Sequence, residues 1–542
     1  MASRATLYVL LSCLAAVSLV RAEDPYLFYT WNVSYGTLSP LGVPQQVILI
    51  NNQFPGPEIN CTSNNNIIVN VFNNLDEPLL FSWNGIQHRK NSWQEGMPGT
   101  NCPIQPGQNF TYHFQPKDQI GTYFYFPSTG FQKVSGGVGG IRVHSRLLIP
   151  VPYSDPEEEF FVFVGDWYTK SHSALRKRLD DGHLLRRPDG VLLNGKTGKT
   201  YRYRLCNIGI KTALNFRIQG HTMRLVELEG SHTVQNTYQS LDLHVGQCMS
   251  VFVTADQTPR DYYMVTSARF TKYSLSATGL VRYVDENGAK IGGPPSPALP
   301  EAPVGWAWSL NQFRSFRWNL TASAARPNPQ GSYHYGAINI TRTIKIVNSN
   351  ANVKGKLRYG INGVSHVDTD TPLKFAEYFG VGHKVFKYNT ISDEPAPESN
   401  TQIAQHPNVN NATFRDFIEI IFENHEKTIQ SWHLDGYSFF PVAIETGKWT
   451  PEKRRNYNLL DAVSRHTIEV YPKSWAAIML TFDNAGMWNL RTNLWERYYL
   501  GQQMYFSVLS PNHSLRDEYN IPDNLELCGI VKNMPKPAPY TP

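Results

Sequence analysis

Short apolar runs separated by Gly, Pro and Asn recur along the whole chain, whereas long stretches with helical periodicity are scarce. Residues 46–50, 67–72, 160–164 and 476–481 are runs of this kind, and their lengths and flanking turn residues are typical of β-strands. Residues 173–181 are predicted to form a short helix. The pattern therefore predicts an all-β chain, and a content of 13% aromatic residues, 39 Gly and 36 Pro agrees with it.

Two changes in composition suggest domain boundaries. Proline-rich stretches occur at residues 150–156, before an acidic run, and at residues 292–300, where a longer irregular stretch begins. A chain of 542 residues has room for about three domains, and domains of this size suit stacked Greek-key β-sandwiches. The predicted division is a signal peptide (1–22), a first domain (23–148), a second domain (158–285), a linker (286–334) and a third domain (335–542).

The N-terminus has the features of a secretory signal. Arg4 supplies a positive charge, residues 7–20 are apolar, and Ala22 ends an acceptable cleavage site. The apolar stretch is too short to span a bilayer, and residues 536–542 lack the apolar tail of a lipid-anchor signal. We expect a secreted, extracellular protein without a membrane anchor.

Sequons for N-glycosylation are consistent with export. The Asn-x-Ser/Thr pattern occurs at Asn32, Asn60, Asn109, Asn319, Asn339, Asn411 and Asn512. We expect that several of these sites carry glycans.

The cysteines predict disulfides and at least one free thiol. Cys13 leaves with the signal peptide, and the odd number that remains in an oxidising compartment allows one or two disulfides. Cys206 and Cys248 both fall in predicted strands of the second domain, and their pairing is one option, which would leave Cys61 free. The sequence alone does not decide between the pairings.

The charge of the chain is mildly basic. A formal charge of +6 permits contact with an acidic cell-wall polysaccharide such as pectin, and it gives no signal for nucleic acid. A solvated surface is favoured over a pectin-binding patch for the basic cluster formed by Arg176, Lys177, Arg178, Arg186 and Arg187. Arg89 and Lys90, beside Trp83 and Trp93, form a weaker candidate.

Other catalytic motifs are absent from the sequence. Residues 136–140 read Gly-Gly-Val-Gly-Gly, which is not a dinucleotide-binding pattern and is predicted to be the turn that enters a strand. No Gly-x-Ser-x-Gly nucleophile elbow occurs. No catalytic residue is assigned.

Five motifs resemble those of plant multicopper oxidases, such as ascorbate oxidases and laccases, in the same order and at the same spacing. They are Asn52-Gln53-Phe54-Pro55-Gly56-Pro57, Ser82-Trp83-Asn84-Gly85-Ile86-Gln87, residues 121–128, residues 430–436 and residues 486–493. The resemblance covers essentially the whole mature chain. It implies three cupredoxin-like domains, in agreement with the all-β prediction. It also implies a disulfide between Cys102 and Cys528, which match positions that are bridged in ascorbate oxidases.

The resemblance also implies where the family holds copper. The type 1 positions are occupied by Gln430, Thr492 and Arg497, with Gln502 at the axial place; the type 2 positions by Ser82 and His433; and the type 3 positions by Asn84, Phe126, Ser128, Asp435, Arg491 and Asn493. Only His433 keeps its ligand type. Thr492 cannot supply a thiolate, Phe126 has no donor atom, and Arg491 is a permanent cation. We therefore expect no copper cofactor, and His433 is only a weak candidate for binding another metal.

The replaced ligands suggest a polar network. Asp435 and Arg491 stand where two ligands of one cluster would face each other, so we expect them to form a buried ion pair. Asn84, Ser128, Asn493 and His433 are expected to complete its hydrogen bonds. A network that joins the domains where metals once did is favoured over a ligand pocket with a new use.

Two longer strings, residues 83–94 and 428–437, resemble the plant skewed-similar branch, and within it the pollen-specific ascorbate oxidase homologues. This resemblance implies a cell-wall role in directional growth such as pollen-tube growth.

Two hypotheses for the function follow. The favoured one is a non-catalytic glycoprotein that binds wall polysaccharide or an extracellular protein. The other is an ascorbate-oxidase-like oxidoreductase with residual or atypical copper binding.

Overall fold

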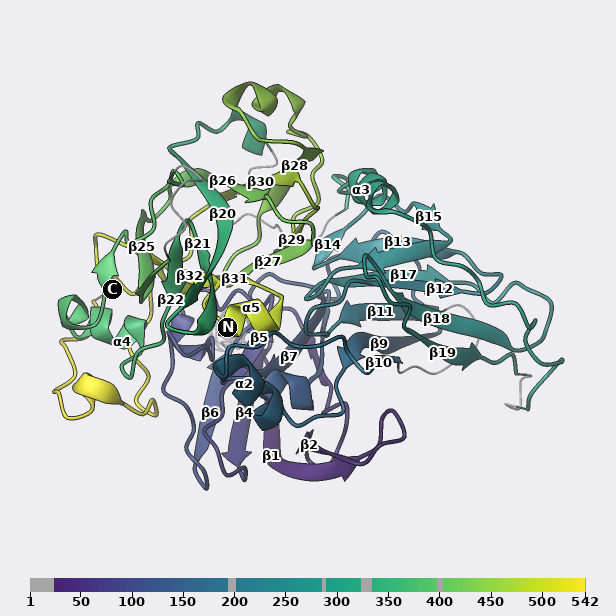
Figure 1. Ribbon diagram of the computed structural model, residues 1–542, viewed down its shortest axis with the longest axis horizontal. Coiled ribbons are helices and arrows are strands. Elements are labelled where there is room, and N and C mark those ends of the chain that lie inside the picture. The colour runs from purple at the N-terminus through teal and green to yellow at the C-terminus, as the bar shows by residue number, and fades with distance from the viewer. Residues whose placement is uncertain (1–23, 194–200, 285–288, 323–333, 397–402, 542) are drawn as a thin grey trace, which may run out of the picture.

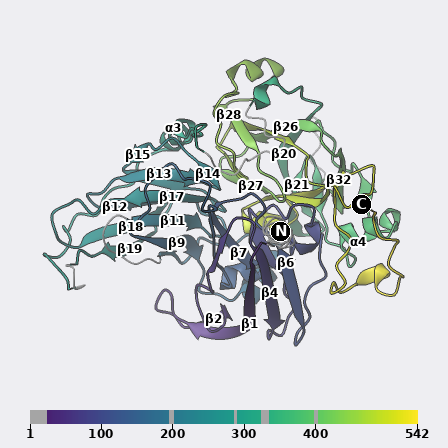
Figure 2. The ribbon, with the colours of Figure 1, turned by 180° about the vertical axis from the view of Figure 1, so that it is seen from behind.

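The computed structural model describes residues 24–193, 201–284, 289–322, 334–396 and 403–541. The predicted signal peptide lies outside these ranges. Three β-rich lobes meet at a common centre (Figures 1 and 2). In Figure 1 the first domain is purple at the bottom, the second is teal at the right, and the third is green to yellow at the upper left.

The first domain is a sandwich of two four-stranded sheets. One sheet has the order β2-β1-β4-β6 and the other β3-β8-β7-β5. The strands are Tyr26–Leu38 (β1), Gln45–Ile50 (β2), Ile59–Thr62 (β3), Asn66–Asn73 (β4), Phe81–Asn84 (β5), Asn109–Phe114 (β6), Gly121–Pro127 (β7) and Gly139–His144 (β8).

The second domain pairs a seven-stranded sheet with a four-stranded sheet. The orders are β10-β9-β11-β17-β13-β14, with β15 paired to β13, and β16-β12-β18-β19. The strands are Glu158–Trp167 (β9), Gly190–Leu193 (β10), Tyr201–Asn207 (β11), Leu214–Ile218 (β12), Met223–Leu228 (β13), Ser231–His232 (β14), Thr237–Tyr238 (β15), Ser240–Leu243 (β16), Cys248–Val253 (β17), Tyr262–Ala268 (β18) and Ser276–Val281 (β19).

The third domain pairs a seven-stranded sheet, β24-β22-β21-β20-β26-β30-β28, with a six-stranded sheet, β23-β25-β32-β31-β27-β29. The strands are Arg342–Val353 (β20), Lys356–Ile361 (β21), Val364–His366 (β22), Lys387–Tyr388 (β23), Ala404–His406 (β24), Asn408–Thr413 (β25), Phe417–Asn424 (β26), Gln430–Leu434 (β27), Phe440–Thr446 (β28), Thr467–Val470 (β29), Ser474–Thr481 (β30), Gly486–Thr492 (β31) and Gln503–Leu509 (β32).

The same strand pairing recurs in each domain. The first long strand lies parallel to a later strand of its sheet, as in β1 with β4, β9 with β11, and β20 with β26. Parallel neighbours require a crossover connection, so each domain has the mixed pairing of a Greek-key sandwich rather than that of a simple meander. The predicted all-β fold is confirmed.

Helices are few and short. The described residues form His172–Asp180 (α2), Trp306–Ser315 (α3), Leu373–Tyr378 (α4) and Trp495–Tyr499 (α5), with 3₁₀ turns at Ser92–Gln94 (η1), Gln132–Ser135 (η2), Tyr335–Ala337 (η3), Gly382–Lys384 (η4), Pro451–Asn456 (η5) and Gly529–Val531 (η6). Helix α2 confirms the predicted helix at residues 173–181. None of the helices in the described ranges has the length and apolarity needed to cross a membrane.

The predicted linker is more ordered than expected. The sequence predicts an irregular stretch for residues 286–334, but helix α3 lies within it and packs between the second and third domains. Leu310 is buried, and the Gln312 side chain donates to the carbonyl of Ser240 (2.8 Å) and accepts from the amide of Asp242 (2.9 Å). These tertiary contacts stabilise a helix that the preceding proline-rich segment does not predict.

The three domains share an apolar cluster at the centre of the molecule. Phe126 of the first domain, Phe163 of the second and Trp495 of the third are buried in it together. The rings of Phe126 and Trp495 pack edge to face with centroids 5.2 Å apart. The interface is therefore packed like a domain interior, which fixes the positions of the polar groups beside it.

Two disulfides form. The predicted bond between Cys102 and Cys528 is confirmed, and it joins the first domain to the C-terminal segment. Cys206 and Cys248, directly opposite each other on β11 and β17, form the second bond. Cys61 is the free cysteine of the described residues, and it is buried.

The free thiol gives a first prediction. Burial raises the pKa of Cys61 to about 12, so the reactive thiolate is scarce at neutral pH. We expect no reaction of the native protein with Ellman's reagent, and one equivalent of thiol after denaturation without reductant. Cys61→Ala, the control, should release none. More than one equivalent from the wild type would show that a disulfide is missing.

Candidate functional site

Two strand pairings bring the predicted site residues to the centre of the molecule. His433 on β27 lies opposite Arg491 on β31 in the third domain. Ser82 on β5 lies opposite Phe126 on β7 in the first domain. In Figure 1, β27 and β31 of the third domain and β5 and β7 of the first are labelled around the meeting point of the lobes. Motifs that are far apart in the sequence therefore form one junction.

A glycine allows the first and third domains to come close. Gly85 follows β5 with φ of +89°, and a Cβ atom there would lie 2.3 Å from Nε2 of His466. Any other residue would be strained in this conformation and would collide with the ring. Gly85 is thus required by the junction itself.

Arg491 and Asp435 form the ion pair that the sequence predicts. Nη1 of Arg491 contacts Oδ2 of Asp435, and their side chains are 1% and 2% exposed. The same Nη1 also donates to Oδ1 of Asn489 (3.3 Å). Burial opposes ionisation of the carboxyl group, but the Arg491 cation prevails and holds the pKa of Asp435 below its usual value. The pair is therefore ionised at neutral pH.

Two histidines extend the pair into a chain. Nε2 of His433 lies 2.7 Å from Oδ1 of Asp435, and its Nδ1 lies 3.1 Å from Nδ1 of His466. A carboxylate only accepts, so His433 carries its proton on Nε2 and His466 donates from Nδ1. Burial lowers the pKa of His433 to about 3, with a contribution from Arg491, and burial also lowers the pKa of His466. Both rings are therefore neutral.

The first domain contributes groups that sequence reasoning missed. Glu95 is buried near this pair, and burial together with the negative charge of Asp435 raises the pKa of Glu95 well above its usual value. His88 lies 3.9 Å from Glu95, and burial lowers the pKa of His88 to about 3. An uncharged Glu95 and an uncharged His88 thus face the ion pair. The sequence predicts no role for either residue, although His88 lies within residues 83–94, one of the two strings that resemble the skewed-similar branch.

The second domain joins the junction through Glu229. Its carboxylate accepts from the amides of His466 and Thr467, both at 2.9 Å. His466 therefore touches the first domain at Gly85 and the second through Glu229. His466 also lies outside every motif that the sequence analysis singled out, so only the fold reveals it.

Three residues expected in the network bond elsewhere. Asn84 donates to the carbonyl of Gly246 (3.2 Å), Ser128 to that of Gly96 (2.5 Å), and Asn493 to the hydroxyl of Ser431 (3.0 Å). The prediction that they complete the hydrogen bonds of the ion pair is wrong. Their short side chains reach the nearest acceptor, which is not Asp435.

The residues at the type 1 positions make separate contacts. Gln430 donates to Asn424 (3.1 Å), and Thr492 donates to the carbonyl of Ser431 (3.3 Å). Arg497 pairs with Glu426 at 2.6 Å. Gln502 is fully buried, and among the described residues its side-chain amide has no hydrogen-bond partner.

Family models described as multicopper oxidase match residues 32–147, 158–286 and 370–514. The chain belongs to the multicopper oxidase family. It is 66% identical to an L-ascorbate oxidase homolog of Brassica napus over 97% of each chain, and 46% identical to the monocopper oxidase-like protein SKU5 of Arabidopsis thaliana over 96% of this chain and 92% of that one.

The fold of this multicopper oxidase family member is shared with solved structures. The multicopper oxidase Fet3p, which functions in iron import, superposes with a TM-score of 0.76 at 18% identity and covers 92% of this chain and 93% of its own. At that identity the likeness concerns the fold alone. Three cupredoxin-like sandwiches are confirmed.

The donor atoms at the junction do not fit the copper cluster that the family holds. Both nitrogens of His433 are engaged, by Asp435 and by His466. Arg491 adds a permanent cation, and Phe126 offers no donor. The amides and hydroxyls at the type 1 positions include no thiolate or imidazole. Within the described ranges, no three His, Cys, Asp or Glu side chains are grouped to hold a metal ion.

The second basic candidate is not a carbohydrate platform. Trp83 and Trp93 are 1% and 0% exposed, so neither ring can stack on a sugar. Arg89 is paired with Asp483 at 3.0 Å, which joins the first domain to the third. The interpretation of Arg89 and Lys90 as a binding patch is therefore withdrawn.

The first basic cluster is partly neutralised. Lys177 pairs with Asp181 (3.1 Å) and Arg176 lies 3.8 Å from Glu77. Arg186 and Arg187 are exposed. A solvated surface remains the simpler interpretation.

The buried pair gives a second prediction. Arg491→Met leaves an unpaired carboxylate in the junction, which should cost about 3–5 kcal/mol, and Asp435→Asn should cost a similar amount. The measurement is the midpoint of thermal unfolding. Lys177→Met, which breaks an exposed pair, is the control and should change stability by less than about 1 kcal/mol. If neither junction variant lowers the midpoint, the pair does not stabilise the junction.

The neutral histidines give a third prediction, which concerns pH. His88 and His433 have folded-state pKa values of about 3, whereas unfolded histidine titrates near ~6.5. The unfolded chain therefore binds more protons below ~6.5, and each ring should lower stability by about 1.4 kcal/mol per pH unit as the pH falls towards the folded pKa.

Glu95 has the opposite effect on stability. Because its pKa is raised in the folded state, folded Glu95 keeps its proton at pH values above the usual pKa of glutamate, where the unfolded chain has lost it. Glu95→Gln should therefore make the acid-induced loss of thermal stability steeper than in the wild type. Parallel profiles for the two proteins between about pH 6.5 and 4.5 would contradict the assignment of a protonated Glu95.

Proposed function

We propose that this chain is a secreted glycoprotein of the multicopper oxidase family that acts in the plant cell wall without copper oxidase chemistry. The observation that carries the proposal is the Arg491–Asp435 pair in the junction, extended by His433 and His466. A guanidinium and two engaged imidazole nitrogens take the space and the lone pairs that a redox-active copper cluster would need.

An extracellular role is supported by the sequence and by the exposure of the sequons. The first 22 residues have the pattern of a signal peptide. All sequon asparagines except Asn319 are exposed, and Asn319 is half-buried, so glycans could be accommodated on the folded surface. Two disulfides suit an oxidising compartment.

The role in directional growth, such as pollen-tube growth, rests on the resemblance to the skewed-similar branch. Relatives in Brassica napus and Arabidopsis thaliana support a plant protein. In this proposal the protein binds a wall polysaccharide such as pectin, which its mildly basic charge permits, or an extracellular protein.

A second candidate is an ascorbate-oxidase-like oxidoreductase with atypical copper binding. One relative is named a monocopper oxidase-like protein, and two neutral imidazoles, those of His433 and His466, lie side by side. Neutral imidazole is a good ligand for copper. A single ion there would have to displace the hydrogen bonds of the chain.

Metal analysis of the mature, secreted protein separates the two candidates and is the fourth prediction. We expect far less than one copper per chain after incubation with Cu²⁺ and desalting, no visible band of a copper–thiolate centre, and no ascorbate-dependent consumption of O₂. Stoichiometric copper with O₂ reduction would overturn the proposal. If copper binds, His433→Gln should abolish it under the second candidate, whereas Lys177→Met should leave it unchanged.

A further inference from the structure

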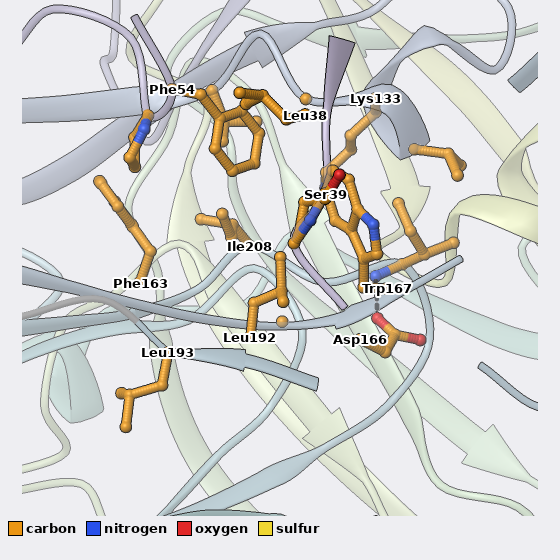
Figure 3. A pocket seen from close by; sticks show the side chains of 17 residues that line it. Leu38, Ser39, Phe54, Lys133, Phe163, Asp166, Trp167, Leu192, Leu193 and Ile208 are labelled. Carbon is orange, nitrogen blue, oxygen red and sulfur yellow. Dashed lines mark hydrogen bonds between the residues drawn. The ribbon is translucent and has the colours of Figure 1, made fainter. Parts of the chain in front are cut away.

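A pocket of about 420 Å³ lies between the first and second domains, away from the ion pair. Figure 3 shows Phe54 and Lys133 on one side of it and Phe163, Asp166 and Leu192 on the other. Ser39 at its edge is exposed, so the pocket can be reached from solvent. Its size is within the range of small-molecule sites.

The walls of the pocket are mostly apolar and partly aromatic. The rings of Phe54 and Trp167 pack edge to face with centroids 5.5 Å apart. Trp167 is held in place because its Nε1 donates to Oε1 of Gln45 (3.1 Å). Val134, Val138, Ile208 and Ile210 also line the pocket. A ligand that fits these walls has a flat, apolar body.

One charged group in the lining has no counterion. Lys133, in the turn η2, is only 5% exposed, and within the described residues its ammonium contacts aromatic rings and forms no salt bridge. Its Nζ lies over the rings of Phe126 (4.4 Å) and Trp495 (5.0 Å). Cation–π contacts recover part of the lost hydration, but a buried ammonium without an anion remains costly.

The carboxylate in the lining is already committed. Asp166 accepts from the amide of Ile210 (2.6 Å) and from the hydroxyl of Thr212 (3.0 Å). It orders the loop after β11 and forms no ion pair with Lys133. Burial and the charge of Arg491 lower the pKa of Lys133 to about 7, although the negative charge of Asp166 acts in the opposite direction. An anion placed in the pocket would favour the charged ammonium.

We propose that this pocket binds a small aromatic monocarboxylate, with its ring between Phe54, Phe163 and Trp167 and its carboxylate paired with the Lys133 ammonium. The inference is independent of the proposed wall function and of any metal. The apolar walls exclude sugars and polyanions, and the single cation selects one negative charge. Pairing inside a pocket of low polarity makes the charge a strong determinant of affinity.

Calorimetric titration of the full-length secreted protein with cinnamate, and with cinnamyl alcohol as its uncharged analogue, tests this inference and is the fifth prediction. We expect one saturable cinnamate site with an affinity at least about tenfold higher than that for the alcohol, as a charge-assisted contact implies. Lys133→Met should remove this preference, whereas Lys177→Met, a change at an exposed lysine, should preserve it.

A second variant keeps the test informative if Lys133→Met fails to fold. Leu192→Trp fills the pocket from β10 and should weaken the binding of both compounds while Lys133 stays in place. Equal affinity for acid and alcohol, or no saturable binding of cinnamate, would overturn the inference. The inference would also be overturned if cinnamaldehyde became covalently attached to Lys133 upon borohydride reduction while cinnamate did not bind, because that result would indicate imine chemistry instead.

Discussion

The ionised pair of Asp435 and Arg491 sets the charge state of everything around it. A guanidinium in a buried junction requires a carboxylate, and once the two are paired there is no further charge to compensate. The neighbouring groups are accordingly neutral: burial keeps protons off His433 and His466, and it keeps one on Glu95.

These groups also join the domains, because they come from different domains. The ion pair belongs to the third domain, Glu95 and Gly85 to the first, and Glu229 to the second, where it accepts from the backbone of His466. In the multicopper oxidase family, metal ions occupy such a junction and bond to residues on both sides. Here the hydrogen bonds from the backbone of His466 and Thr467 to Glu229 and the ion pair of Arg89 with Asp483 connect the domains.

The fold and the central ion pair could be predicted from the sequence, because they depend on periodicity and on motif positions. The all-β fold followed from the short apolar runs, and the pair of Asp435 and Arg491 followed from two motif positions that a known fold places face to face. The sequence could not predict where Asn84 and Ser128 would bond, because short polar side chains take the nearest backbone acceptor. Glu95, His466 and Lys133 were missed since burial and tertiary contact, not local pattern, give them their roles.

The two unusual polar features of the molecule meet at Phe126. Where the family resemblance places a copper ligand, this ring instead packs against Trp495 and forms one wall of the cage around the Lys133 ammonium. The charge of Arg491 in the junction disfavours the protonated lysine, and the same lysine lines the apolar pocket. A substitution that removes a metal donor thus also creates an aromatic surface on which a buried cation can rest, and an anion in the pocket would offset the repulsion that reaches it from the junction.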